Sequence, residues 1–193
     1  MSTARPGRPR ESRVDQAIAA AVPAVLAEVG YRRLTVDAVA ARAGVGKAAI
    51  YRRHPTKQEM VFAAVVHDTR IDPPPDSGSL RGDLAALAHA IVDSLTRPAA
   101  GTVLGLLADV LTDPGLARRF AETYLAAERA CIDEVLRRAV ERGELPRTPE
   151  VARVHALLLG PVFAWVFQLQ QSDPHGFADE LAELLVSALT ADR

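Results

Sequence analysis

The sequence predicts an all-α fold of about nine helices, arranged as a small N-terminal three-helix domain and a larger C-terminal helical domain. The chain has 193 residues, of which 49% are hydrophobic, and it is rich in long alanine- and leucine-containing stretches. No segment sustains the alternation of polar and apolar residues that a half-buried strand requires. Glycine and proline divide the apolar stretches into segments of helical length, so each can be assigned in turn.

Residues 1–11 are expected to form a disordered basic arm, because proline, glycine and arginine dominate residues 4–10 and leave nothing to bury. Arg8 and Arg10 are candidate contacts to a narrow A·T-rich minor groove, where the enhanced negative potential attracts arginine. The alternative is a charged, solubilising tail without ordered contacts.

The first helix is expected over residues 12–29. Val14, Ile18, Val22 and Val25 recur at helical spacing and form one apolar stripe. Pro23 lacks a backbone donor, so a kink is expected at that position. Gly30 is expected to end the helix.

Residues 35–53 have the pattern of a helix, a tight turn and a second helix. The hydroxyl of Thr35 can cap the first helix, and Gly44 can take the left-handed conformation that redirects the chain. In the second helix Val45, Ala49 and Ile50 supply buried contacts, while the remaining residues, Gly46, Lys47, Ala48, Tyr51, Arg52 and Arg53, are left facing outward.

The outward face of the second helix has small side chains near its N-terminal end and cationic side chains along its length. Gly46 and Ala48 permit close approach to base edges in a major groove about 12 Å wide, and Lys47 and Tyr51 are placed for phosphates. Charge is distributed accordingly: residues 1–60 hold 11 Lys or Arg against 5 Asp or Glu, a balance of +6, whereas the remainder has 12 against 19, a balance of −7. A net charge of −1 therefore conceals a cationic N-terminal part suited to a polyanion.

Residues 35–62, including the run IYRRHPTKQEMV, resemble the DNA-binding domain of the TetR family of bacterial transcription regulators. The resemblance implies that Thr35, Lys47, Tyr51 and Lys57 hold phosphates, that Gly46, Ala48 and Arg52 lie near base edges, and that Val45 and His54 belong to the same DNA-binding set. His54 and Gly46 depart from the family pattern, which usually has a bulky aromatic residue and a serine or threonine at these positions. His54 is expected to remain a packing residue, with a phosphate contact as its alternative.

A fourth helix over residues 57–71 is expected to connect the two domains, with Thr56 and Glu59 forming its capping box. The proline-rich residues 72–79 mark a linker loop. Residues 80–193 are predicted to form an effector-binding and dimerisation domain, with helices near residues 80–97, 100–112, 114–142, 149–171 and 176–190.

The last two helices are assigned to a two-fold interface. Residues 151–171 are apolar on nearly all sides, which requires cover on both faces, and TetR-family members likewise dimerise through their last two helices. The expected interface residues are Val154, Leu158, Pro161, Val162, Val166, Leu181, Leu184 and Leu185. A core helix of a monomer is the alternative interpretation.

The resemblance also implies a pocket for a small-molecule effector between residues 67 and 165. Candidate lining residues are Phe62, Val66, His89, Leu106, Leu107, Tyr124, Phe163 and Trp165, although apolar residues at helical spacing are more often ordinary core.

An enzyme is not expected. The five histidines, His54, His67, His89, His155 and His175, show no metal-ligand spacing, and no nucleophile elbow or phosphate-binding glycine loop is present. No metal and no cofactor are therefore predicted. Cys131 is expected to pack in a core, and no apolar run is expected to reach the length of a membrane span, so a cytoplasmic protein is predicted. The predicted partners are a double-stranded DNA operator, a second copy of the chain and an unknown effector; the alternative is a non-enzymatic helical adaptor with a basic surface.

Overall fold

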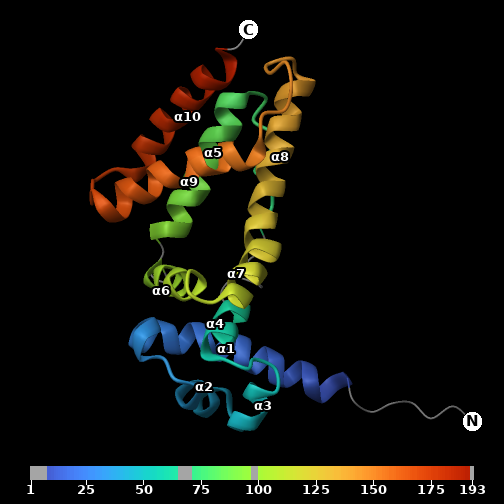
Figure 1. The fold of residues 1–193 in the computed structure, drawn as a ribbon, viewed down its shortest axis with the longest axis vertical. Coiled ribbons are helices and arrows are strands. Elements are labelled where there is room, and N and C mark those ends of the chain that lie inside the picture. The colour runs from blue at the N-terminus through green and yellow to red at the C-terminus, as the bar shows by residue number, and fades with distance from the viewer. Residues whose placement is uncertain (1–7, 65–70, 97–99, 192–193) are drawn as a thin grey trace, which may run out of the picture. The chain divides into compact units, whose positions relative to one another are not determined.

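The computed structural model describes residues 8–64, 71–96 and 100–191, and within those ranges all regular secondary structure is helical, which confirms the all-α prediction (Figure 1). The chain divides into two compact units. The first comprises Met1–Arg70 and Pro98–Ala121, and the second comprises Ile71–Arg97 and Glu122–Arg193. The sequence had placed residues 80–193 in a single domain, so the assignment of residues 98–121 to the first unit differs from that prediction.

The first unit opens with α1 (Arg8–Arg33), whose only residue with non-helical dihedral angles is Gly30, at φ 72° and ψ 167°. The helix therefore breaks where the sequence predicted its end, and a short turn follows. One expectation is corrected: α1 begins at Arg8, so residues 8–11 are helical and do not belong to a disordered arm. The dihedral angles at Pro23 are helical, and the kink expected there stays a prediction. Residues 1–7 lie outside the described residues.

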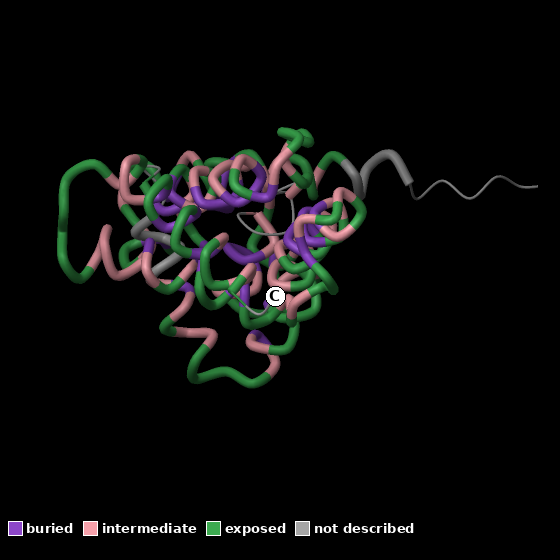
Figure 2. Tube along the Cα trace, turned by 90° about the horizontal axis from the view of Figure 1, so that it is seen from above, coloured by how far each residue is buried: buried purple, intermediate pink, exposed green. Residues whose placement is uncertain are grey.

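Three short helices follow α1: α2 (Val36–Ala43), α3 (Lys47–Tyr51) and α4 (Lys57–Phe62). Their apolar sides meet α1 in a core to which Ile18, Val22, Val39, Ile50 and Met60 contribute side chains that are almost completely buried. Along the helices of the chain buried and exposed residues interleave, as an amphipathic pattern requires (Figure 2).

Helix α6 (Ala100–Val110) and helix α7 (Pro114–Phe120) complete the first unit. The Tyr31 hydroxyl donates a hydrogen bond to Asp109 on α6, and a Cβ at Gly105 would collide with the Tyr31 ring. On α4, the ring of Phe62 meets Phe120 edge-on at 6.1 Å between centroids. These contacts explain why α6 and α7 belong with the helix-turn-helix region.

The second unit is built from α5 (Leu80–Thr96), α8 (Ala126–Glu141), α9 (Val151–Phe163) and α10 (Pro174–Thr190). One π-helical segment, Ala121–Leu125, precedes α8 and another, Ala164–Gln168, follows α9. Leu84, Val92, Val135, Leu136 and Leu158 are fully buried in the core that these helices share. The sequence predicted the positions of these helices, but not the π-helical turns within them.

Residues 71–79 are non-helical, as the proline-rich pattern predicted for residues 72–79. This loop is tied to the second unit through Asp83, which is fully buried and accepts hydrogen bonds from both the backbone N–H and the hydroxyl of Ser77, at 2.8 and 2.7 Å. Arg142 approaches the same carboxylate at 3.0 Å and also pairs with Asp76 and Glu144. Of the predicted connector, residues 57–71, the structure describes α4 up to Phe62, two π-helical residues at 63–64 and Ile71, which is not helical, whereas residues 65–70 lie outside the described ranges.

The predicted dimer-interface residues are only partly available to a partner. Five of them are buried in the protomer's own core: Val154, Leu158, Val162, Leu181 and Leu185. Pro161 and Val166 are half-buried, and Leu184 is 66% exposed. This corrects the interface prediction, because α9 and α10 turn their most regular apolar stripes inward, onto α5 and α8.

Two helical segments have the length and composition of a membrane span, Arg13–Arg33 and Val151–Gln168, with mean hydropathies of 1.2 and 1.4. The expectation that no such segment exists was therefore wrong. Core helices of soluble proteins meet the same criterion, and both segments supply buried residues to the cores described above.

Candidate nucleic-acid interface

Helix α2 has the N-cap and the left-handed glycine that the sequence pattern predicted. Thr35 Oγ1 accepts from the backbone N–H of Ala38 at 3.2 Å, and Gly44 adopts the left-handed conformation at φ 66° and ψ 30°. The N–H of Val45 then donates to the carbonyl of Ala40 at 3.1 Å, which closes the turn. The predicted helix-turn-helix is therefore present, with Thr35 as the N-cap of α2.

Helix α3 presents one face to its own unit and one to solvent. Ile50 is fully buried, and Val45 and Ala49 are partly covered, whereas Gly46, Lys47, Ala48 and Arg52 are exposed. Tyr51 is a large aromatic side chain with 50% of its surface exposed. The opposite face of α3 is buried against the first unit, so the position of the helix is fixed. An exposed tyrosine among small and cationic residues is then suited to a contact with a partner.

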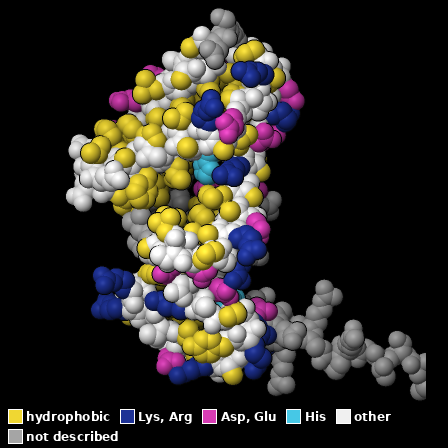
Figure 3. Space-filling model, in the orientation of Figure 1, with side chains coloured by type: hydrophobic (Ala, Val, Ile, Leu, Met, Phe, Trp, Pro, Cys, Tyr) yellow, Lys and Arg dark blue, Asp and Glu magenta, His cyan; other side chains and the backbone are white. Residues whose placement is uncertain are grey.

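Most cationic side chains around this face already have an acidic neighbour. Lys47 Nζ lies 2.5 Å from Asp37 Oδ1, Arg42 pairs with Glu28, and Arg53 pairs with Asp15. Arg53 is thus drawn inward onto α1, which corrects the expectation that it faces outward. Figure 3 accordingly shows Lys and Arg side chains interspersed with Asp and Glu side chains around the helix-turn-helix part of the chain.

Arg52 differs from these residues. Within the described parts of the chain its side chain has no ion-pair partner, and it lies immediately after the last residue of α3. The hydrogen bond and charge of Asp37 raise the pKa of Lys47, so its ammonium remains charged. The face therefore offers two exposed cations, one at each end of α3.

Lys57, an expected phosphate contact, makes contacts within the first unit. Its ammonium donates to the backbone carbonyl of Tyr31 at 2.7 Å and stands 4.7 Å from the centre of the Tyr31 ring. Burial lowers the pKa of Lys57, although the charge of Asp109 acts in the opposite sense. In this structure Lys57 joins α4 to α1, and its expected phosphate contact stays a prediction.

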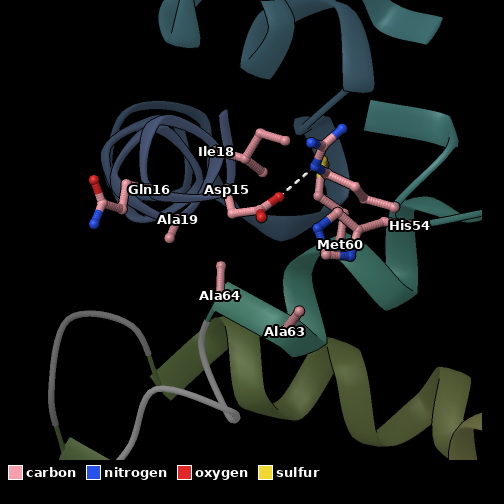
Figure 4. Close-up of a pocket in the computed structure, with 9 residues that line it drawn as sticks. Asp15, Gln16, Ile18, Ala19, His54, Met60, Ala63 and Ala64 are labelled. Carbon is pink, nitrogen blue, oxygen red and sulfur yellow. Dashed lines mark hydrogen bonds and ion pairs between the residues drawn. The ribbon is translucent and has the colours of Figure 1, made fainter. Parts of the chain in front are cut away.

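His54 lines a hollow of about 430 Å³ between α1 and the segment that joins α3 to α4 (Figure 4). Ile18, Ala19, Met60 and Ala64 line the same space. Burial lowers the pKa of His54, although the charges of Asp15 and Glu59 raise it. A half-buried, predominantly neutral imidazole beside apolar side chains favours the packing role over the phosphate contact. The side chains of Arg8 and Arg10 lie outside what the structure describes, so their expected minor-groove contact stays a prediction.

The predicted effector-lining residues are divided between the two units. Phe62, Leu106 and Leu107 belong to the first unit, and His89, Tyr124, Phe163 and Trp165 to the second, whereas Val66 lies outside the described residues. Neither unit therefore contains the predicted set as a whole. Within the second unit, Trp165 stacks on Phe177 at 4.2 Å between centroids, and Phe163 meets Phe167 at 5.0 Å.

The acidic partners were missed by sequence reasoning. Asp15 and Arg53 are separated by 38 positions, and Glu28 and Arg42 by 14, so no local spacing identifies them as pairs. Asp37 was interpreted only as a favourable charge at the start of α2. No local spacing pairs it with Lys47 either, because most of α2 and the turn lie between the two residues.

Comparison with known proteins supports this geometry. A model described as "Bacterial regulatory proteins, tetR family" matches residues 18–64, and one described as "Tetracyclin repressor-like, C-terminal domain" matches residues 74–185. The uncharacterized HTH-type transcriptional regulator Rv1556 of Mycobacterium tuberculosis is 38% identical over 141 residues, which cover 72% of this chain and 67% of that protein.

Solved structures have the same fold. The TetR family transcription regulator SCO0332 is 28% identical and superposes with a TM-score of 0.74, over 91% of this chain and 97% of that one. FadR from Bacillus subtilis, whose structure is a complex with stearoyl-CoA, is 18% identical with a TM-score of 0.56 over the same shares, and this likeness concerns the fold alone.

Proposed function

The chain belongs to the TetR family of bacterial transcription regulators, which are DNA-binding proteins and not enzymes, and we propose that it is a repressor that binds a near-palindromic operator as a homodimer. A small-molecule effector would release it from DNA. A regulator of this kind acts in the cytoplasm, where the family's soluble members generally work.

The observation that carries the proposal is the exposed face of α3. Gly46 and Ala48 leave room for the helix to approach the floor of a major groove, and Tyr51 offers a ring and a hydroxyl one turn later. Lys47 and Arg52 supply positive charge at the two ends of the helix. The buried contact of Ile50 holds this face at a fixed angle to α2 and α1, so the face is preorganised for a rigid duplex.

Dimerisation is proposed on the outward sides of α9 and α10. Leu184 is 66% exposed and Leu157 is 43% exposed, and Gly160 beside Leu157 permits close approach of a second helix. A two-fold axis through this surface would pair each helix with its copy. The two copies of α3 would then lie about 34–36 Å apart, in successive major grooves.

The effector is proposed to bind mainly in the second unit. The aromatic side chains of Phe163 and Trp165 beside the π-helical turn offer apolar contact area for a small molecule. Stearoyl-CoA, which is bound in the structure of FadR, is an example of a ligand in a protein of this fold. An effector that lowers operator affinity must itself bind less tightly to the DNA-bound dimer, since the coupling between the two sites is reciprocal.

Selection of bound fragments from random duplex DNA tests the proposal. The expected product is an inverted repeat with half-sites about one helical turn apart. Uniform retention of all duplexes, or no retention near physiological salt, would instead favour the adaptor with a basic surface. A reporter controlled by the recovered repeat then distinguishes repression, which is expected, from activation.

A further inference from the structure

The ion pair between Lys47 and Asp37 lies at the point where α3 begins, on the exposed side of the helix-turn-helix. We propose that these two residues together read one G·C base pair in each operator half-site. Lys47 would contact guanine, and Asp37 would hold the ammonium in place while accepting from cytosine. The inference rests on the proposed function and adds to it the chemical identity of one base pair.

The position of Lys47 on the helix is the first step. Recognition helices contact base edges mainly through their N-terminal residues. Here α3 extends only over Lys47–Tyr51, its N-cap is Gly46 and its second residue is Ala48. Within the first turn of α3, therefore, Lys47 has the only side chain that can form a hydrogen bond, and any polar base readout by this turn depends on it.

The chemistry of an ammonium group selects the base. Lysine has three N–H donors and no acceptor, so it needs acceptors only. In the major groove, guanine presents two adjacent acceptors, N7 and O6. Adenine places its N7 beside a donor amino group, and thymine places its O4 beside a methyl group, so both match an ammonium less well.

Asp37 supplies the hydrogen-bond acceptor for the cytosine of the same base pair. Its carboxylate lies in the first turn of α2, is largely exposed, and approaches Lys47 Nζ at 2.5 Å. A carboxylate close to DNA is repelled by phosphates unless it finds a donor, and the N4 amino group of cytosine is the donor that carboxylates take in the major groove. The pair thus sets a donor beside an acceptor, which is the complement of guanine acceptors beside the amino donor of cytosine.

Arg52 provides the contrast. It follows the last residue of α3, away from the N-terminal turn, and no acidic side chain among the described residues neutralises it. A cation at that end of the helix lies nearer the sugar–phosphate backbone, where contacts position the protein without reading sequence. We therefore assign the phosphate contact to Arg52, whereas the family resemblance had suggested a phosphate contact for Lys47.

The experiment uses the full-length protein and the duplex recovered by selection. Each G·C pair of the half-site is replaced in turn by A·T, and binding is measured as a function of salt. For the wild type, one substitution is expected to weaken binding about 5- to 100-fold, the cost of one bidentate base contact. In Lys47→Ala the loss of affinity on replacing this one G·C pair disappears. The slope of the logarithm of the binding constant against that of the salt concentration changes little.

Arg52→Ala is the matched control, since it removes an exposed cation from the other end of the same helix. It is expected to weaken binding to all sequences alike and to reduce the salt slope by about 1. Lys47→Gln is a second test, because glutamine pairs with adenine N6 and N7, and this variant should prefer A·T at the position that the wild type requires as G·C. Asp37→Ala should reduce discrimination at that position while overall affinity is retained or rises, since a negative charge near phosphates is removed.

If Lys47→Ala weakens binding uniformly and lowers the salt slope as Arg52→Ala does, Lys47 is a phosphate contact and the inference is overturned. The same conclusion follows if Lys47→Ala keeps the wild-type penalty at every G·C pair. A wild type that shows no sequence preference would contradict the proposed function itself, so the two failures are distinguishable. Circular dichroism of each variant confirms that the exposed substitutions leave the fold intact.

Discussion

The ammonium of Lys57 donates a hydrogen bond of 2.7 Å to the backbone carbonyl of Tyr31, and it lies over the ring of the same residue. The Tyr31 hydroxyl in turn donates to Asp109. Burial, together with the hydrogen bond and charge of Asp109, raises the pKa of the Tyr31 phenol, so it remains a donor at all ordinary pH values. The side chain of Tyr31 on α1 thereby contacts both α4 and α6 within the first unit.

We predict that Lys57→Met lowers the free energy of unfolding by about 1–2 kcal/mol, the combined scale of a hydrogen bond from a charged group and a cation–π contact. Methionine retains much of the apolar stem, so the loss reports on the ammonium. Urea denaturation measures the change. Lys47→Met serves as the control, since Lys47 is exposed, and an equal effect of both substitutions would contradict the role assigned to Lys57.

Asp83 should make the second unit sensitive to acid. Burial alone would raise its pKa, but the hydrogen bonds from Ser77 and Arg142 outweigh burial and lower the pKa below the ordinary 3.8. A lowered folded-state pKa contributes stability above the unfolded-state value, and this contribution is lost as the pH falls toward and through the folded-state value. We predict that Asp83→Asn costs about 1–3 kcal/mol near neutral pH, because a buried, hydrogen-bonded carboxylate is removed.

The pH profile is the sharper measurement for Asp83. Below about pH 4 the unfolding free energies of the wild type and Asp83→Asn should converge, since the wild type then loses what the variant already lacks. Asp133→Asn, an exposed substitution on α8, controls for the general effect of removing a carboxylate. Parallel curves for the wild type and Asp83→Asn down to pH 2 would contradict the account.

Cys131 should be an unreactive thiol in the folded protein. Its side chain is buried and its Sγ lies 3.5 Å from the carbonyl oxygen of Ile71. Burial raises the pKa of the thiol, and the negative charges of Asp72 and Glu128 raise it further. Because the thiolate is the reacting species, we predict alkylation by iodoacetamide at pH 8 at least about tenfold slower than in urea, followed by mass spectrometry. Equal rates in both conditions would show that Cys131 is accessible.

Association of two protomers should depend on Leu184. We predict that Leu184→Glu shifts the monomer–dimer equilibrium strongly toward monomer in sedimentation equilibrium, because a charge would be buried against its two-fold copy. Leu111→Glu is the control, since Leu111 is 86% exposed but lies on the first unit, outside the proposed interface. A dimer that is equally stable in both variants would exclude the outward faces of α9 and α10 as its contact surface.

The features that sequence reasoning predicted correctly depend on neighbours along the chain. Thr35 and Thr56 cap their helices as expected, and Gly44 takes the left-handed conformation at the turn. Each of these needs only a side-chain hydroxyl or a missing Cβ within a few residues of its partner. The starts of α7 in the first unit and α10 in the second likewise coincide with prolines that follow an aspartate, at Asp113-Pro114 and Asp173-Pro174.

The features that sequence reasoning could not predict depend on contacts between segments that are distant along the chain. Residues 151–171 are apolar on nearly all sides, so nothing in the pattern shows which side faces the protomer's own core, and Leu158 was assigned to the wrong surface. The placement of α6 rests on contacts such as that of Tyr31 with Asp109, which are 78 positions apart. The position of Lys57 was taken from the family resemblance, which contains no information on its contact with Tyr31.

The spacing of two half-sites tests the central claim most directly. The claim is that two copies of α3, related by a two-fold axis, occupy successive major grooves on one side of the duplex. Affinity is measured for the selected inverted repeat and for the same repeat with about 5 base pairs, half a helical turn, inserted at its centre. Affinity for the lengthened site is predicted to fall to the level of non-specific duplex. Undiminished affinity for it would contradict the account.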